Sequence, residues 1–195
     1  MAVLNDFQCN GLFPSVVGGN STSVLYFPRL LGSSIGVQSV APSATSAAGQ
    51  LVVPGFNELN GQLFTVRAAG NFGSDTGDAS GTVTVQLYAN TGTVTSPIYT
   101  SIATTGAVVP GFASAEPWAL TATMQGDTLS GLCGGSYTAF VGGQKAGSSG
   151  QNTTVALNGI NFGAAVPFGL VVGVTFGTGN STNRASLFQF QITQE

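Results

Sequence analysis

This chain has no histidine and very few charged side chains, although it is 195 residues long. Lys and Arg together number four, Asp and Glu number seven, and the charged share of 6% lies far below the roughly 25% of typical soluble domains. Without histidine, the chain lacks the usual proton shuttle of active sites and the commonest metal ligand. Without clustered basic residues, it lacks the positive surface that nucleic-acid binding needs. We therefore expect a non-enzymatic protein with no metal, no other cofactor and no nucleic-acid partner.

Long apolar runs and cysteines are also scarce. No run reaches the roughly 18 apolar residues of a membrane helix, because the longest candidate, residues 164–176, is interrupted by Pro167 and by glycines. The first residues, MAVLNDFQCNG, lack the basic and apolar regions of a secretory signal. Cys9 and Cys133 are interpreted as two reduced, buried thiols, with a single disulfide as the alternative. We expect no membrane partner.

What is present is a pattern of short β-like runs from about residue 62 onward. In QLFTVRAA and GTVTVQLYA, alternate residues are apolar, which is typical of a half-buried strand. Turn clusters rich in Gly, Asn, Asp and Ser separate eight such runs: residues 62–69, 81–89, 97–105, 118–125, 129–140, 153–160, 168–176 and 186–193. The pattern predicts an all-β protein, an antiparallel β-sandwich that is jelly-roll-like with about eight strands, over residues 62–195.

Residues 1–61 have a different character. Short apolar clusters alternate with Gly, Ser and Ala stretches, and prolines, which are confined to strand edges and turns, recur among them. This predicts an extended N-terminal arm with short strands, packed either on its own domain or on a neighbouring subunit. The residues predicted to contact another subunit are Phe7, Leu12, Phe13, Leu25, Tyr26, Phe27 and Phe56. Deleting residues 1–57 is expected to leave a folded domain.

Carboxylates offer the main enzymatic alternative. Glu116 and Asp127 flank the run 118–125, so they are expected at opposite ends of one strand, too far apart for glycoside hydrolysis. We interpret Asp127 as a turn residue and Glu116 as a rim charge beside the core residue Trp118. Lys145, the one lysine, lies in a Gly/Ser-rich loop with no serine placed for a Ser–Lys dyad.

The segment NFGSDTGD, residues 71–78, could present Asp75, Asp78 and backbone carbonyls to a calcium ion. It lacks the ligand spacing and the terminal Glu of an EF-hand, so a polar turn between two strands is the preferred interpretation.

Five segments together resemble a group of tailed-bacteriophage virion proteins, the head decoration or cement proteins. They are FTVRAAGN (64–71), VTVQLYANTG (83–92), PWALTATMQGD (117–127), PFGLVVGVTF (167–176) and NRASLFQFQ (183–191). The resemblance covers residues 62–193 and leaves the arm outside. It implies a jelly-roll-like sandwich made in the bacterial cytoplasm and placed on the outside of the capsid. There it would bind the major capsid protein, associate as a homotrimer and bridge neighbouring capsid subunits.

A second hypothesis makes the chain a carbohydrate- or receptor-binding β-sandwich of a phage head fibre or tail spike. Such modules bind sugars through aromatic and amide side chains in loops. The aromatic candidates are Tyr88, Tyr99, Trp118 and Tyr137. Trp118 alternates with core residues, so we expect it to be buried.

Overall fold

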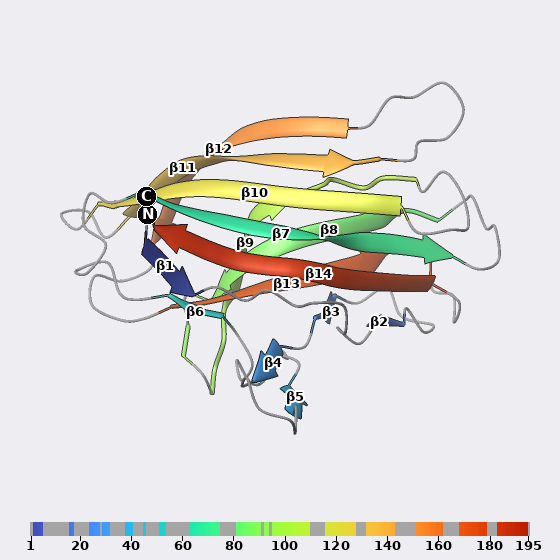
Figure 1. Cartoon of the computed structure of the whole chain (residues 1–195), viewed down its shortest axis with the longest axis horizontal. Coiled ribbons are helices and arrows are strands. Elements are labelled where there is room, and N and C mark those ends of the chain that lie inside the picture. Colours follow the sequence, from blue (N-terminus) through green and yellow to red (C-terminus); the bar gives the residue numbers. More distant parts are fainter. Residues whose placement is uncertain are drawn as a thin grey trace.

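The computed structural model describes residues 2–5, 16–17, 24–27, 29–31, 38–40, 45, 51–53, 63–74, 81–90, 92–93, 95–109, 116–127, 132–142, 151–161, 168–178 and 183–194. Figure 1 shows their strands stacked in layers. The strands are β1 (Ala2–Asn5), β2 (Val16–Val17), β3 (Leu25–Tyr26), β4 (Arg29–Leu31), β5 (Gln38–Val40), β6 (Leu51–Val53), β7 (Leu63–Ser74), β8 (Val83–Asn90), β9 (Tyr99–Thr104), β10 (Glu116–Asp127), β11 (Leu132–Val141), β12 (Gln151–Asn161), β13 (Phe168–Phe176) and β14 (Asn183–Gln194). In this part of the chain, no helix is long and apolar enough to cross a membrane.

Two antiparallel sheets form the sandwich. The large sheet has the order β1-β14-β7-β10-β11-β12, and β2 also pairs with β14. The small sheet has the order β3-β13-β8-β9, and β6 also pairs with β13. Of the eight strands after residue 62, the first, β7, pairs with the last, β14, and the second, β8, pairs with the second to last, β13. Pairing of early strands with late strands is typical of a jelly roll. The predicted all-β antiparallel sandwich, with its eight strands after residue 62, is confirmed.

The predicted turn at residues 71–78 is partly wrong, because β7 continues to Ser74. Phe72 is buried, so the alternation of the strand extends past the predicted end and places this ring inside the sandwich. Asp75 and Asp78 lie outside the described residues.

The short strands of the predicted arm belong to the sandwich itself. β1 and β2 pair with β14, whereas β3 and β6 pair with β13, so this region extends both sheets of its own domain. Leu25 lies in β3, opposite Val174. The predicted contact residues Phe7, Leu12, Phe13 and Phe56 lie outside the described residues, as does Cys9.

The prediction that Phe27 contacts another subunit is corrected by the structure. Its side chain is only 3% exposed, and its backbone N–H donates to the carbonyl oxygen of Val172 at 2.9 Å. Consecutive residues of an extended chain point to opposite faces, so Phe27 points into the core while Tyr26 points outward. The Phe27 ring is therefore occupied within its own domain and does not serve as a contact with another subunit.

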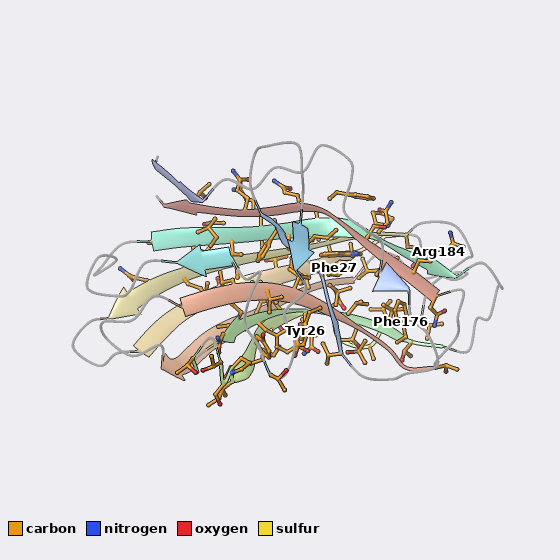
Figure 2. All side chains as sticks on the ribbon, turned by 90° about the horizontal axis from the view of Figure 1, so that it is seen from below. Tyr26, Phe27, Phe176 and Arg184 are labelled. Atoms are coloured by element: carbon orange, nitrogen blue, oxygen red, sulfur yellow. The ribbon has the colours of Figure 1, made fainter. Side chains whose placement is uncertain are left out.

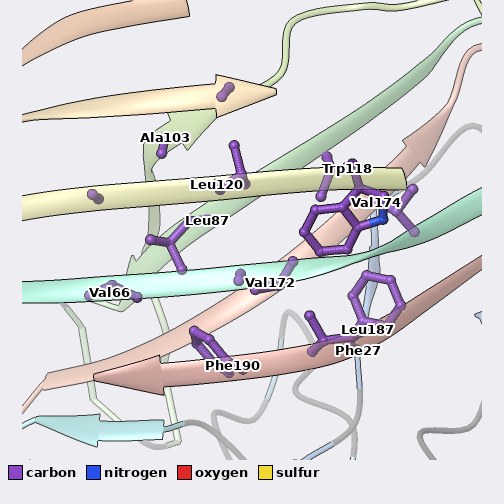
Figure 3. Close-up of a cluster of buried hydrophobic side chains, with 14 of the residues drawn as sticks. Phe27, Val66, Leu87, Ala103, Trp118, Leu120, Val172, Val174, Leu187 and Phe190 are labelled. Atoms are coloured by element: carbon purple, nitrogen blue, oxygen red, sulfur yellow. The ribbon is translucent and has the colours of Figure 1, made fainter. Parts of the chain in front are cut away.

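The core lies between the two sheets. Figure 3 shows Phe27 beside Trp118 and Leu187, and the ring centroids of Phe27 and Trp118 are 6.3 Å apart. Trp118 lies against Gly70, where an added Cβ would be 2.8 Å from the indole ring. Burial of a side chain as large as Phe contributes about 1.5–3 kcal/mol. Phe27 therefore anchors residues 24–27 to the rest of the sandwich.

Candidate binding site

Strand alternation places three tyrosines on the outer face of the small sheet. In β8 the side chains of Val85 and Leu87 are buried, so Tyr88 projects from the opposite face. Cross-strand partners share a face, and Tyr99 is paired with Asn90, two residues after Tyr88. Tyr26 of β3 is paired with Gly173 of β13 on that same face.

The three rings form what we call the tyrosine cluster: Tyr26, Tyr88 and Tyr99. The Tyr26 centroid lies 5.8 Å from that of Tyr88 in an edge-to-face arrangement and 4.8 Å from that of Tyr99. The Tyr88 and Tyr99 centroids are 6.4 Å apart, also edge-to-face. Such pairs stabilise a structure by about 0.5–1.5 kcal/mol beyond their burial. Tyr88 is 8% exposed, whereas Tyr26 and Tyr99 keep part of their rings accessible to solvent.

Gly173 leaves the space that the cluster fills. A Cβ at this position would lie 2.8 Å from Cγ1 of Val24, 3.0 Å from Cε2 of Tyr88 and 3.3 Å from Cδ1 of Tyr26. Any larger residue would push these side chains apart. The glycine therefore leaves room for the Tyr26 ring to contact both other tyrosines. Figure 2 labels Tyr26 and Phe27 and shows the two side chains apart from each other.

A polar chain runs beside the rings. The Tyr88 hydroxyl donates to Oε1 of Gln86 at 2.7 Å, and Nε2 of Gln86 donates to Oγ of Ser101 at 3.0 Å. Burial, reinforced by the neighbouring Tyr26, raises the pKa of Tyr88 to about 12. Burial also raises the pKa of Tyr26, with a smaller contribution from Tyr99. At neutral pH these hydroxyls are therefore uncharged and can both donate and accept hydrogen bonds.

The β8–β9 connection next to Tyr99 is held by the buried side chain of Asn90. Its Oδ1 accepts hydrogen bonds from the backbone N–H groups of Gly92 and Ile98, each at 2.9 Å. Its Nδ2 donates to the carbonyl oxygen of Thr93 at 3.2 Å. Ile98 is 61% exposed and adjoins Tyr99. The connection therefore presents an exposed apolar residue from a fixed backbone.

The tyrosine cluster and its polar neighbours offer uncharged groups that can contact a ligand. Tyr26, Tyr88, Tyr99, Gln86 and Ser101 provide aromatic surface, phenolic hydroxyls, an amide and an aliphatic hydroxyl, and none of them is charged at neutral pH. Within the described ranges, no three His, Cys, Asp or Glu side chains are grouped so that they could hold a metal ion. Aromatic surface with a few directed polar groups is the usual chemistry of sites for small polar ligands.

The structure brings together only part of the aromatic set predicted for sugar binding. Tyr88 and Tyr99 adjoin each other, but Trp118 and Tyr137 are buried in the core between the sheets. Tyr26 was predicted only as a subunit contact, and it completes the cluster. Two-residue β3 gives no periodic signal, so its partner strand could not be read from the sequence.

The predicted carboxylate pair is separated as expected. Glu116 and Asp127 are the first and last residues of the twelve-residue β10. The prediction of Glu116 as a rim charge is wrong, because its side chain is 4% exposed. β10 begins at Glu116 itself, and this residue shares the inward face with Trp118. Cys133 lies in β11, opposite Gly126, while Lys145 is outside the described residues.

Comparison with known proteins gives little beyond the fold. No protein-family model matches the chain. No curated protein matches its sequence either. Among solved structures, the chain is similar to a legume lectin-like domain from Entamoeba histolytica, with 11% identity and a TM-score of 0.33. The match covers 93% of this chain and 87% of that one.

Proposed function

We propose that the protein is a non-enzymatic carbohydrate- or receptor-binding β-sandwich of a phage virion, and that the tyrosine cluster is its binding site. The observation that supports this function best is the grouping of three tyrosines with Gln86 and Ser101 on one outer face. The C–H face of a sugar ring packs on aromatic rings, and sugar hydroxyls exchange hydrogen bonds with amides and phenols. The fixed connection that ends at Ile98 borders the site.

A panel of immobilised neutral and acidic oligosaccharides, together with purified lipopolysaccharide, tests this function. We expect the full chain to bind at least one of these glycans. Tyr99→Ala should weaken that binding by about tenfold or more, because it removes a partly exposed ring. Gly173→Val should have a similar effect by displacing Tyr26.

Phe188→Ser is the matched control, because Phe188 is an exposed aromatic residue on the other sheet. It should bind as the parent chain does. If no glycan binds, or if all three variants bind equally well, the tyrosine cluster is not a sugar site.

A second candidate function rests on a different observation. The outward residues of β7, β10 and β11 are almost all uncharged, and Phe140 and Phe188 are exposed on the large sheet. Such a surface favours contact with other proteins, as expected for a capsid decoration protein that binds the major capsid protein and bridges its subunits. Repetition of weak contacts over a closed shell would give high avidity.

High-resolution imaging of purified virions separates the two functions. Density for this chain at regular positions of the head lattice, with three copies grouped at each position, supports the decoration protein. Density restricted to a fibre or a tail tip supports the receptor-binding module. A virion without the chain contradicts both.

A further inference from the structure

Three polar side chains beside the tyrosine cluster form a chain of hydrogen bonds that has one direction. The Tyr88 hydroxyl donates to Oε1 of Gln86, and Nε2 of Gln86 donates to Oγ of Ser101. A phenol is more acidic than an aliphatic hydroxyl, so it is the better donor and belongs at the donating end. The chain of donors therefore starts at Tyr88 and ends at Ser101.

The hydroxyl of Ser101 keeps its own hydrogen for a ligand. A serine hydroxyl has one donor hydrogen and two lone pairs, and the bond from Gln86 uses a lone pair. Among the residues that the structure describes, no other group exchanges a hydrogen bond with this hydroxyl. Ser101 is exposed, so its hydrogen is available to an acceptor on a bound molecule.

Ser101 lies next to the aromatic part of the site. It pairs with Tyr88 across β8 and β9, and it shares the outer face of the small sheet with Tyr99, two residues earlier in β9. Two residues along a strand span about 6.8 Å, so the hydroxyl and the partly exposed Tyr99 ring can contact one sugar residue together. The surface therefore offers a hydrogen-bond donor directly beside an apolar contact.

This pair of features matches an acetamido group better than a plain sugar hydroxyl. In an acetamido group, one carbon carries both a methyl group and a carbonyl oxygen, which only accepts hydrogen bonds. The oxygen can accept from Ser101 while the methyl group packs on Tyr99. A sugar hydroxyl can also accept from Ser101, but it has no methyl group to place on the ring. A site that uses both contacts discriminates between sugars that differ only in this substituent.

The charge of the site favours a neutral acceptor. Tyr26, Gln86, Tyr99 and Ser101 are all uncharged at neutral pH, and the whole chain carries a formal net charge of -3. A carboxylate also accepts hydrogen bonds, but it would meet no cation among these side chains and would face a negatively charged protein. An amide carbonyl oxygen avoids both costs.

We propose that the tyrosine cluster binds sugars that carry an acetamido group, and that Ser101 selects them by donating a hydrogen bond to the acetamido carbonyl oxygen. Gln86 is a positioning residue, since it occupies a lone pair of Ser101 and leaves the hydrogen free. This specificity rests on the proposed function, because it concerns the same cluster and narrows its ligands to one class of sugar.

Isothermal titration of the full chain with two matched pairs of oligosaccharides tests this specificity. One pair consists of glucose and N-acetylglucosamine oligomers with the same linkage, and the other of galactose and N-acetylgalactosamine oligomers. The members of a pair differ only in having a hydroxyl or an acetamido group on one ring carbon. We expect the acetamido member of at least one pair to bind about tenfold more tightly than its partner.

Two substitutions determine whether this preference comes from Ser101. Ser101→Ala removes the donor and should lower the preference by about three- to tenfold, the value of one hydrogen bond between neutral groups. Gln86→Glu should lower it similarly, because a carboxylate only accepts hydrogen bonds and takes up the hydrogen of Ser101. Ser136→Ala changes an exposed serine on β11 of the other sheet, so this matched control should keep the full preference.

The possible outcomes separate this specificity from the proposed function. If both members of each pair bind equally well, or if Ser101→Ala keeps the full preference, the acetamido specificity is wrong while the sugar site stands. Full preference in Gln86→Glu overturns the positioning role of Gln86. If none of these oligosaccharides binds, the specificity is wrong as well. Binding of another glycan that Tyr99→Ala weakens then decides whether the cluster is a sugar site.

Discussion

Two neighbouring residues, Tyr26 and Phe27, divide their roles between the surface and the core. Tyr26 contacts Tyr88 and Tyr99 on the outer face of the small sheet, and Phe27 packs near Trp118 between the sheets. One step along an extended chain reverses the direction of the side chain. The position of the Tyr26 ring therefore depends on how well the Phe27 ring fits the core.

Tyr88 gives a pH-dependent prediction at the same scale. Its pKa is raised to about 12 in the folded protein, against 10.0 for a free tyrosine. The unfolded chain therefore loses this proton at a lower pH than the folded chain does. The contribution of Tyr88 to the free energy of unfolding should be fully present below pH 10. It should be lost as pH rises from 10 to about 12.

Urea unfolding across this pH range measures the effect, with Tyr88→Phe as the comparison. The variant has no phenolic proton at this position, so its unfolding free energy should fall less steeply than that of the parent. Parallel curves for the two proteins would show that Tyr88 does not carry the effect.

At the scale of elements, the β8–β9 hairpin depends on one side chain. Asn90 makes three hydrogen bonds to the backbone of the connection, to Gly92, Thr93 and Ile98. Asn90→Ala should lower the free energy of unfolding by about 1–3 kcal/mol, because it removes three part-buried hydrogen bonds at once. It should also speed amide exchange of Ile98.

Thr93→Ala is the control for this hairpin. Thr93 Oγ1 accepts a hydrogen bond from the backbone N–H of Ser96 at 3.0 Å, and both residues are exposed. The substitution should cost about 0.5 kcal/mol or less, in line with surface changes. Equal losses of stability in both variants would contradict the role given to Asn90.

The strands from β7 to β14 could be predicted because their residues alternate over many positions. Val83, Val85 and Leu87 mark one face of β8 in the sequence as clearly as in the structure. Short β3 has no such pattern, and it pairs with β13, which lies far along the chain. The burial of Glu116 could not be foreseen either, because a carboxylate near a strand end is ordinarily solvated. The sequence therefore predicted two members of the tyrosine cluster but not their third partner.

At the scale of the whole molecule, the N-terminal region and the sandwich form shared sheets. β3 and β6 extend the small sheet, and Phe27 fills part of the core. Deleting residues 1–57 should therefore weaken the fold, contrary to the expectation from the sequence. The loss should be at least as large as that of Phe27→Ala in the full chain, about 3–5 kcal/mol for a buried Phe.

A chain that lacks only residues 1–23 keeps Tyr26 and Phe27 and is the matched comparison. Its thermal unfolding midpoint should lie well above that of the chain without residues 1–57. Equal midpoints would show that residues 24–57 contribute nothing to the stability of the sandwich.

The connection held by Asn90 has a consequence for how this protein could diversify. Asn90 makes its three hydrogen bonds to backbone atoms of Gly92, Thr93 and Ile98, so these bonds do not require particular side chains at Thr95, Ser96 and Ile98. All three of these side chains are exposed. Substitutions at these positions can change the surface beside Tyr99 while the hydrogen bonds of Asn90 are kept. Binding preference can therefore change during evolution without a change of fold.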